Sequence, residues 1–178
     1  MIKELIKSDA YMLHHRIEIC GYHLDRQELS KTLVENMLHY EGVGLSANQI
    51  GIWERAFCMM TDVETQETIT CFNPKIIKTY GDPVLFEEGC LSFPDEIINI
   101  ERPDRIVVKY EDEDERVHKL KLDGFVARVF QHEFDHLQGK LYLEYASDMK
   151  LQRAMKKREK KFKTLETDLA LRKIENES

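Results

Sequence analysis

The sequence predicts an α+β fold, with antiparallel β-sheets around a buried central helix that carries an H-E-x-x-H motif, and with a C-terminal amphipathic helix. Three observations predict it. Strand-like segments follow one another without the strand–helix alternation of a parallel sheet. A helical pattern over residues 124–137 is apolar on nearly every side, so this helix should be buried. Another helix begins near "SDMK" (147–150) and continues towards the C-terminus.

The first helix is expected over residues 25–40. Asp25 and Glu28 have the spacing of a capping box, and leucine or methionine then recurs every four residues. Gly42 and Gly44 end this pattern.

Strands are expected on both sides of two turns. "AFCMM" (56–60) and "TITCF" (68–72) enclose a polar turn. "RIVVKY" (105–110) and "RVHKLKL" (116–122) predict a hairpin whose acidic tip, residues 111–115, is a solvated turn. The central helix then follows from about Gly124 to Leu137.

The composition indicates one soluble globular unit: 178 residues, 42 % of them hydrophobic and 33 % charged. We expect a catalytic part over residues 1–147 and a C-terminal helix over 148–178 that packs on it or extends from it. No apolar run approaches the ~20 residues of a membrane helix, and no signal-peptide pattern is present. The net charge of -7 argues against DNA as a partner. Four widely spaced cysteines without a C-x-x-C pair indicate reduced thiols in a cytoplasm.

A candidate metal motif lies on the central helix, in "QHEFDH". His132 and His136 are four residues apart and share one helical face, so they could bind one ion, and Glu133 could reach a ligand of that ion. Two hydrogen-bonded core histidines are the alternative. Against that alternative, a glutamate on an otherwise apolar helix is costly to bury unless something charged compensates it.

The third ligand is not where two classes of zinc protease have it, because those positions hold Tyr142 and Lys156. Cys90 lies in "EEGCLSFP", which resembles a shaped turn more than a core strand. One cysteine and two histidines would leave a fourth position open for water, as a catalytic site requires. A small core residue is the alternative for a lone cysteine.

A third segment is "GVGLSANQIG" (42–51), whose glycines would let the backbone approach a ligand closely; a helix C-cap and loop is the alternative. Together, "GVGLSANQ", "EGCLS" and "QHEFDH" resemble the peptide deformylase motifs G-x-G-L-A-A-x-Q, E-G-C-L-S and Q-H-E-x-D-H, in the same order. The resemblance covers roughly residues 25–165. It implies a hydrolase of protein biosynthesis that removes the formyl group from the N-terminal formylmethionine of nascent proteins and releases formate.

The resemblance also implies the roles of site residues. Cys90, His132 and His136 would bind the metal, which the resemblance implies is iron(II) in the cell, with zinc, nickel or cobalt as substitutes. Glu133 would be the acid and base. The Gln49 side-chain amide and the Leu91 backbone N–H would stabilise the oxyanion.

Substrate-binding residues are expected around this site. The backbones of Gly44 and Gly89 are suited to pair with an extended peptide. Phe125, Val129 and His132 share a helical face, which together with Val43 is expected to line the pocket for the methionine side chain.

The sequence departs from the family pattern at a few positions. Ser46 replaces an alanine, and Asn48 replaces a usual proline, so the loop before Gln49 is expected to be less rigid. "KSDAYMLHH" lacks the usual D-P-x-L. Arg128 stands where the family has an aliphatic residue. We expect its head to reach solvent while its stem packs; narrowing of the pocket, or a place at its mouth beside a carboxylate, is the alternative.

Two groups of charges complete the expectations. Arg102 should pair with Glu88 and hold the turn of Cys90; two unrelated surface charges are the alternative. Residues 150–163 hold eight Lys or Arg and one Glu, opposite an apolar face of Leu151, Met155, Phe162, Leu165 and Leu169. The apolar face should dock on the catalytic part or a partner. The basic face should bind ribosomal RNA, unless it is an ordinary solvated surface.

Two other functions remain open at this level. A zinc peptidase that cuts internal peptide bonds would need a ligand downstream of His136. A catalytically inactive peptide- or ribosome-binding relative would be expected to lack a ligand or Glu133, yet all are present. Metal content and formate release distinguish the three.

Overall fold

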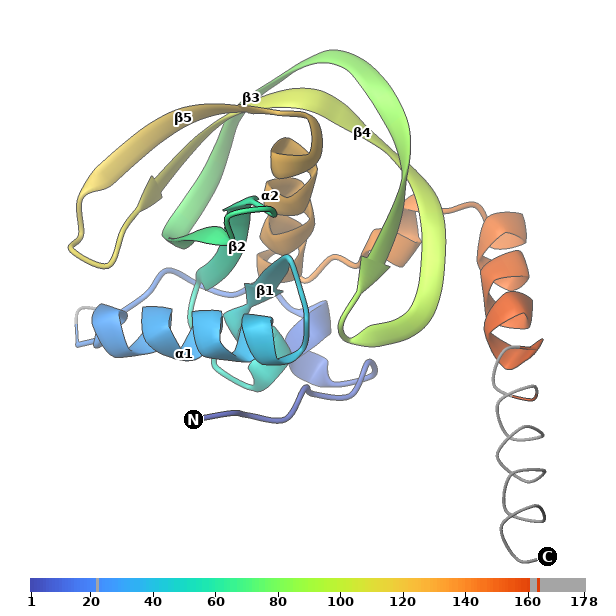
Figure 1. Cartoon of the computed structure of the whole chain (residues 1–178), viewed down its shortest axis with the longest axis horizontal. Coiled ribbons are helices and arrows are strands. Elements are labelled where there is room, and N and C mark those ends of the chain that lie inside the picture. Colours follow the sequence, from blue (N-terminus) through green and yellow to red (C-terminus); the bar gives the residue numbers. More distant parts are fainter. Residues whose placement is uncertain (22, 161–162, 164–178) are drawn as a thin grey trace, which may run out of the picture.

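The computed structural model describes residues 1–21, 23–160 and 163. Its strands form one antiparallel sheet in sequence order, so the α+β prediction is confirmed, although one sheet replaces the several that we expected. The strands are β1 (Gly44–Ser46), β2 (Ala56–Asp62), β3 (Glu67–Cys90), β4 (Phe93–Glu111) and β5 (Val117–Asp123). The helices are α1 (Arg26–His39) and α2 (Gly124–Leu137), with short 3-10 helices η1 (Tyr11–His14), η2 (Ala47–Ile50) and η3 (Tyr142–Tyr145). In Figure 1 the long strands arch over α2.

The two predicted helices are confirmed and cover opposite faces of β2. Phe57 and Met59 face the cluster that contains Phe130 of α2. The alternate residues of β2 face the cluster that contains Leu33 and Met37 of α1. Because successive side chains of a strand point to opposite faces, a strand between two helices is apolar throughout, as "AFCMM" is.

The β3–β4 ribbon is longer than predicted. The sequence indicated a strand only over residues 68–72 and a shaped turn over "EEGCLSFP", whereas β3 continues to Cys90, which pairs with Phe93 across a two-residue turn. Register shifts interrupt the pairing at four places and bend the ribbon. Gly81 and Pro83 lie in its exposed middle, where the alternation of polar and apolar residues is lost.

The segment before α1 packs on the end of α2, although its family pattern is missing. Leu13 and Ile17 are buried, and the Ile17 N–H donates to the Leu137 carbonyl. Gly139 has φ +70°, and a Cβ there would lie 2.7 Å from the His15 backbone. Gly139 is thus required by backbone conformation and by close packing of the N-terminal segment.

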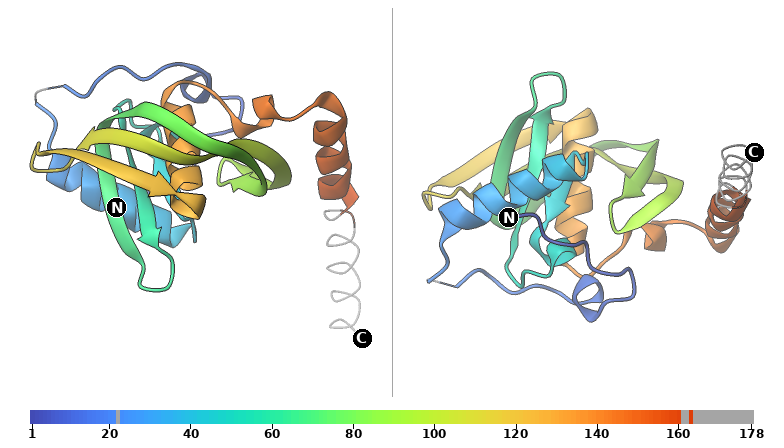
Figure 2. Two further views of the ribbon diagram at one scale, coloured as in Figure 1. Left: turned by 90° about the horizontal axis from the view of Figure 1, so that it is seen from above. Right: turned by 60° about the horizontal axis from the view of Figure 1, so that its bottom comes forward.

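The C-terminal helix is described over residues 148–160 and docks on β4. Leu151 and Ala154 pack against the cluster of Ile98, Ile100 and Tyr142. Arg158, which interrupts the apolar face in sequence, forms an ion pair with Glu96. Figures 1 and 2 place this helix at the end of the molecule opposite the β4–β5 turn.

The apolar face of this helix was only partly predicted. Leu151 docks, whereas Met155 is 49 % exposed; Ala154 and Arg158, which are outside the predicted apolar face, also contact β4. Phe162, Leu165 and Leu169 lie outside the described residues. No helix among the residues that the structure describes is long and apolar enough to cross a membrane.

The predicted ion pair of Glu88 and Arg102 is confirmed. Arg102 Nε lies 2.6 Å from Glu88 Oε1, and Arg102 Nη2 lies 3.0 Å from Oε2. Arg102 Nη1 also lies 2.7 Å from Asp135 Oδ2 on α2. All three side chains are nearly or fully buried. One guanidinium therefore joins β3, β4 and α2.

Replacing Arg102 with methionine should destabilise the protein strongly, because two buried carboxylates lose a partner. We expect the free energy of unfolding to fall by about 3–5 kcal/mol. Arg105→Met is the matched control, since Arg105 pairs with Asp104 at the surface, and its change should stay within about 0.5 kcal/mol. Urea unfolding of the metal-free proteins measures both, and equal losses would contradict a special role of Arg102.

Candidate metal centre

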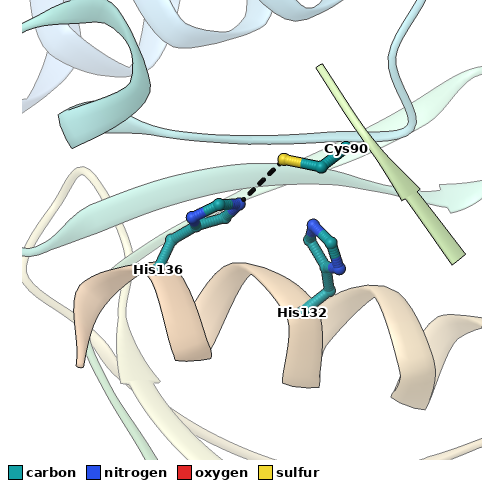
Figure 3. Close-up of side chains that lie close together, drawn as sticks. All are labelled: Cys90, His132 and His136. Atoms are coloured by element: carbon teal, nitrogen blue, oxygen red, sulfur yellow. Dashed lines mark hydrogen bonds between the residues drawn. The ribbon is translucent and has the colours of Figure 1, made fainter. Parts of the chain in front are cut away.

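Three side chains converge between the end of β3 and the middle of α2. Cys90 is the last residue of β3, and His132 and His136 lie one turn apart on α2, as Figure 3 shows. One ligand atom from each lies within 4.8 Å of the others. Cys90 Sγ is 3.2 Å from His136 Nε2. The convergence predicted for these three side chains is confirmed.

The chemistry of this cluster fits a metal ion. A thiolate and two imidazoles suit zinc, iron and similar divalent ions. The second ring nitrogen of His132, Nδ1, lies 3.1 Å from Glu88 Oε2. That contact leaves Nε2 as the ligand atom, in the carboxylate–histidine arrangement common at metal sites. Glu133 Oε2 is buried and has no hydrogen-bond partner among the described residues, as expected of a carboxylate beside a metal-ligand water.

Glu133 lies in a crowded, dry position. It is 4 % exposed, and the loss of solvation raises the pKa of its carboxyl to about 7. A Cβ at Gly44 would come 2.5 Å from Glu133 Oε1, and one at Gly42 would come 2.8 Å from Leu91 Cδ1. Glycine is therefore required at both positions because a side chain there would collide with Glu133 or Leu91. From the sequence, these glycines were explained by the close approach of a ligand.

The Gln49 side chain has a fixed orientation. Its Oε1 accepts hydrogen bonds from the Ser46 N–H and hydroxyl, both at 2.9 Å. Its Nε2 is then directed at the Cys90 turn, 3.4 Å from Cys90 Sγ and 3.1 Å from Ser92 Oγ. The change from alanine to Ser46 thus adds a donor that orients Gln49.

Asn48 corrects the expectation of a looser loop. The side chain is fully buried, and its Nδ2 donates to the carbonyls of His136 at 2.8 Å and Met12 at 3.3 Å. The loop before Gln49 is therefore tied to the end of α2 by hydrogen bonds in place of a proline ring.

An open cavity of about 410 Å³ adjoins the cluster. All of the site residues named from the sequence line this cavity except His136, which is buried. Those lining residues are Val43, Gly44, Gln49, Gly89, Cys90, Leu91, Phe125, Val129, His132 and Glu133. The structure thus brings these residues together, and their roles in binding and catalysis stay predictions.

The expectation that Arg128 turns to solvent is wrong. It is 8 % exposed and lines the cavity beside a carboxylate, as in the alternative. Arg128 Nη1 lies 2.7 Å from Glu88 Oε1 and 3.1 Å from the Ile100 carbonyl, and Nη2 lies 2.6 Å from the Val84 carbonyl. The buried Glu88 carboxylate and Ile100 carbonyl, together with the partly buried Val84 carbonyl, hold the guanidinium inside the protein.

Glu88 consequently accepts four hydrogen bonds, two from Arg102 and one each from Arg128 and His132. Burial alone would raise the pKa of Glu88, but the hydrogen bonds from His132 and Arg102 hold it at about 2. Glu88 is therefore a carboxylate at neutral pH.

Sequence reasoning gave no role to Ser92 or Asp135, which contact Gln49 and Arg102. Both stand inside the quoted motifs, "EGCLS" and "QHEFDH". Their place inside these motifs was the one sign in the sequence that they have a role. The contacts themselves could not be predicted, because Gln49 and Arg102 belong to other segments.

Comparisons with known proteins agree with this site. The polypeptide deformylase family profile matches residues 2–152. A peptide deformylase of Wolbachia pipientis wMel is 36 % identical over 166 residues, covering 88 % of this chain and 93 % of the relative. That of Thermotoga maritima is 44 % identical over 127 residues, covering 70 % and 76 %.

The fold agrees as well. The crystal structure of a peptide deformylase from Legionella pneumophila superposes with a TM-score of 0.83 at 30 % identity, over 94 % of this chain and 98 % of that one. The family match spans most of the chain and includes all three ligand segments. With its Cys-His-His cluster, typical of these enzymes, this chain belongs to the peptide deformylase family.

Proposed function

We propose that the protein hydrolyses the N-formyl group of peptides that begin with formylmethionine, releasing formate, with one divalent metal ion held by Cys90, His132 and His136. The observation that carries the proposal is the convergence of these ligands beside the buried Glu133 at a 410 Å³ cavity. When bound, such an ion lowers the pKa of water towards ~7 and polarises a carbonyl oxygen.

The protein's own residues then transfer the protons and stabilise the negative charge that develops on the substrate oxygen. Glu133, next to the ligands, takes a proton from water and delivers it to the departing amine. The Gln49 amide, oriented by Ser46, and the Leu91 backbone N–H donate hydrogen bonds to the oxyanion. Removing one such donor typically costs about 10²–10³ in kcat.

The cavity offers two kinds of contact to a peptide. Gly44 of β1 and Gly89 of β3 border it, and their backbones can pair with an extended chain. Val43, Phe125 and Val129 supply apolar surface for an unbranched thioether side chain.

Iron(II) is the metal that we propose for the cell, with zinc, nickel or cobalt able to replace it, since a Cys-His-His set accepts all four. A peptidase that cuts internal bonds has less support, because Tyr142, at the position of the expected third histidine, donates its hydroxyl to the Glu96 carbonyl. Formylated nascent chains place the proposed reaction in the cytoplasm, where proteins are made.

Substitutions at Cys90 and Glu133 should separate metal binding from turnover. Cys90→Ser should lose the metal, because a hydroxyl is a far weaker ligand than a thiolate. Glu133→Ala should keep one metal per chain and lose about 10²–10⁴ in kcat/KM for formate release from a formyl-methionyl peptide.

Cys20→Ser is the matched control, since Cys20 is a buried thiol in a different cluster. It should keep the metal and the activity. Full metal content and activity in Cys90→Ser would refute the ligand set, and parental turnover in Glu133→Ala would refute the acid/base role.

We also propose that the basic C-terminal helix binds ribosomal RNA. Lys150, Arg153, Lys156, Lys157 and Lys160 are exposed on it, while Leu151 and Ala154 face β4. Binding to RNA phosphates releases counterions, so it weakens steeply with salt.

Charge reversal on this helix should abolish co-sedimentation with ribosomes while hydrolysis of a short formyl peptide continues. The variant replaces Lys156, Lys157, Lys160 and Lys161 with Glu, of which Lys161 lies outside the described residues. The control makes the same charge change on exposed strand residues, at Lys75, Lys78, Lys119 and Lys121. Equal, salt-insensitive association of both variants would rule the contact out.

A further inference from the structure

A second cavity lies beside the one at the metal cluster. It measures about 210 Å³, and both cavities are lined by Phe125 and Arg128. The remaining lining of the second cavity comes from the β3–β4 ribbon and the start of α2: Val84, Phe86, Pro103, Asp104 and Gly124. Phe125 and Arg128 are therefore the boundary between the two spaces.

Arg128 is held rigidly at this boundary. Its guanidinium donates to Glu88 and to the carbonyls of Val84 and Ile100, so it is fixed to both strands of the ribbon. Its Cζ also lies 5.6 Å from the centroid of the Phe86 ring, within the range of a cation–π contact. A substrate side chain could push the guanidinium aside only by breaking these charge-assisted hydrogen bonds, and those to Glu88 and Ile100 are buried.

The charges around Arg128 explain why the head stays in place. Arg102 is shared between Glu88 and Asp135, so one guanidinium faces two buried carboxylates. Arg128 supplies the second positive charge through Glu88. Two arginines then balance two carboxylates, and moving Arg128 would leave a buried negative charge in excess.

We propose that Arg128 is a specificity-determining residue, which closes the pocket for the substrate's first side chain on the side of the second cavity and limits the length of chain accepted. The inference rests on the proposed function. An aliphatic residue here would join the two spaces, whereas Arg128 keeps about 210 Å³ out of reach. The protein therefore accepts a side chain of methionine length and rejects longer unbranched ones.

The test is a competition between two formyl peptides in one reaction, one starting with methionine and one with 2-aminooctanoic acid, whose unbranched side chain is longer. The ratio of their kcat/KM values does not depend on the amount of folded, metal-loaded enzyme, so a loss of stability or metal leaves it unchanged. Each additional buried methylene is worth about fourfold. Arg128→Ala should therefore raise the ratio of long to methionine substrate by about tenfold or more.

Two variants serve as controls. Arg128→Lys retains a long cationic side chain and should restore a ratio close to that of the parent. Arg26→Ala removes another ion-paired, largely buried arginine, remote from both cavities, and should leave the ratio unchanged.

Three results would each overturn this inference while leaving the proposed function intact. They are a ratio in Arg128→Ala within about twofold of the parental ratio, an equal rise of the ratio in Arg26→Ala, and a parent protein that already prefers the longer peptide. If the metal-loaded parent releases formate from neither peptide, the proposed function is overturned, and the inference with it.

Discussion

The buried Glu88 carboxylate is the contact on which the metal site depends. It stands two residues before Cys90 on β3 and accepts hydrogen bonds from Arg102 on β4 and from Arg128 and His132 on α2. A buried carboxylate is costly unless it is fully paired, so these partners must stay together. The strand that carries the cysteine is thereby locked against the helix that carries the two histidines.

The same contact sets the chemistry of one ligand. Because Glu88 accepts from Nδ1 of His132, the opposite nitrogen is left for the metal, and its basicity rises. On the other side of the cluster, Gly44 leaves space for Glu133, and Ser46 orients Gln49. The three sequence motifs are thus three segments whose side chains hold one another in position.

The predictions from the sequence that the structure confirms rest mostly on local patterns. The bounds of α2 and the convergence of His132 and His136 follow from helical spacing, and the ion pair of Glu88 with Arg102 was anticipated. The buried place of Arg128 beside a carboxylate was only the alternative, because two of its three acceptors are carbonyls of β3 and β4 that only the folded ribbon brings near. The middle of the ribbon and its end at Cys90 were missed, since Gly81 and Pro83 interrupt its pattern. The hydrogen bond of Asn48 depends on the end of α2, which lies far away in the sequence.

The dependence of the metal site on Glu88 is tested most directly by the metal affinity of Glu88→Gln, measured by competition with a chelator. Glu87→Gln, at a neighbouring exposed glutamate, is measured beside it. An amide keeps the shape of the side chain but loses the charge that pairs with Arg102, Arg128 and His132. We predict that Glu88→Gln binds the metal about 10–100-fold more weakly, while Glu87→Gln binds it as the parent does. Parental affinity in Glu88→Gln would contradict the claim that this carboxylate holds the site together.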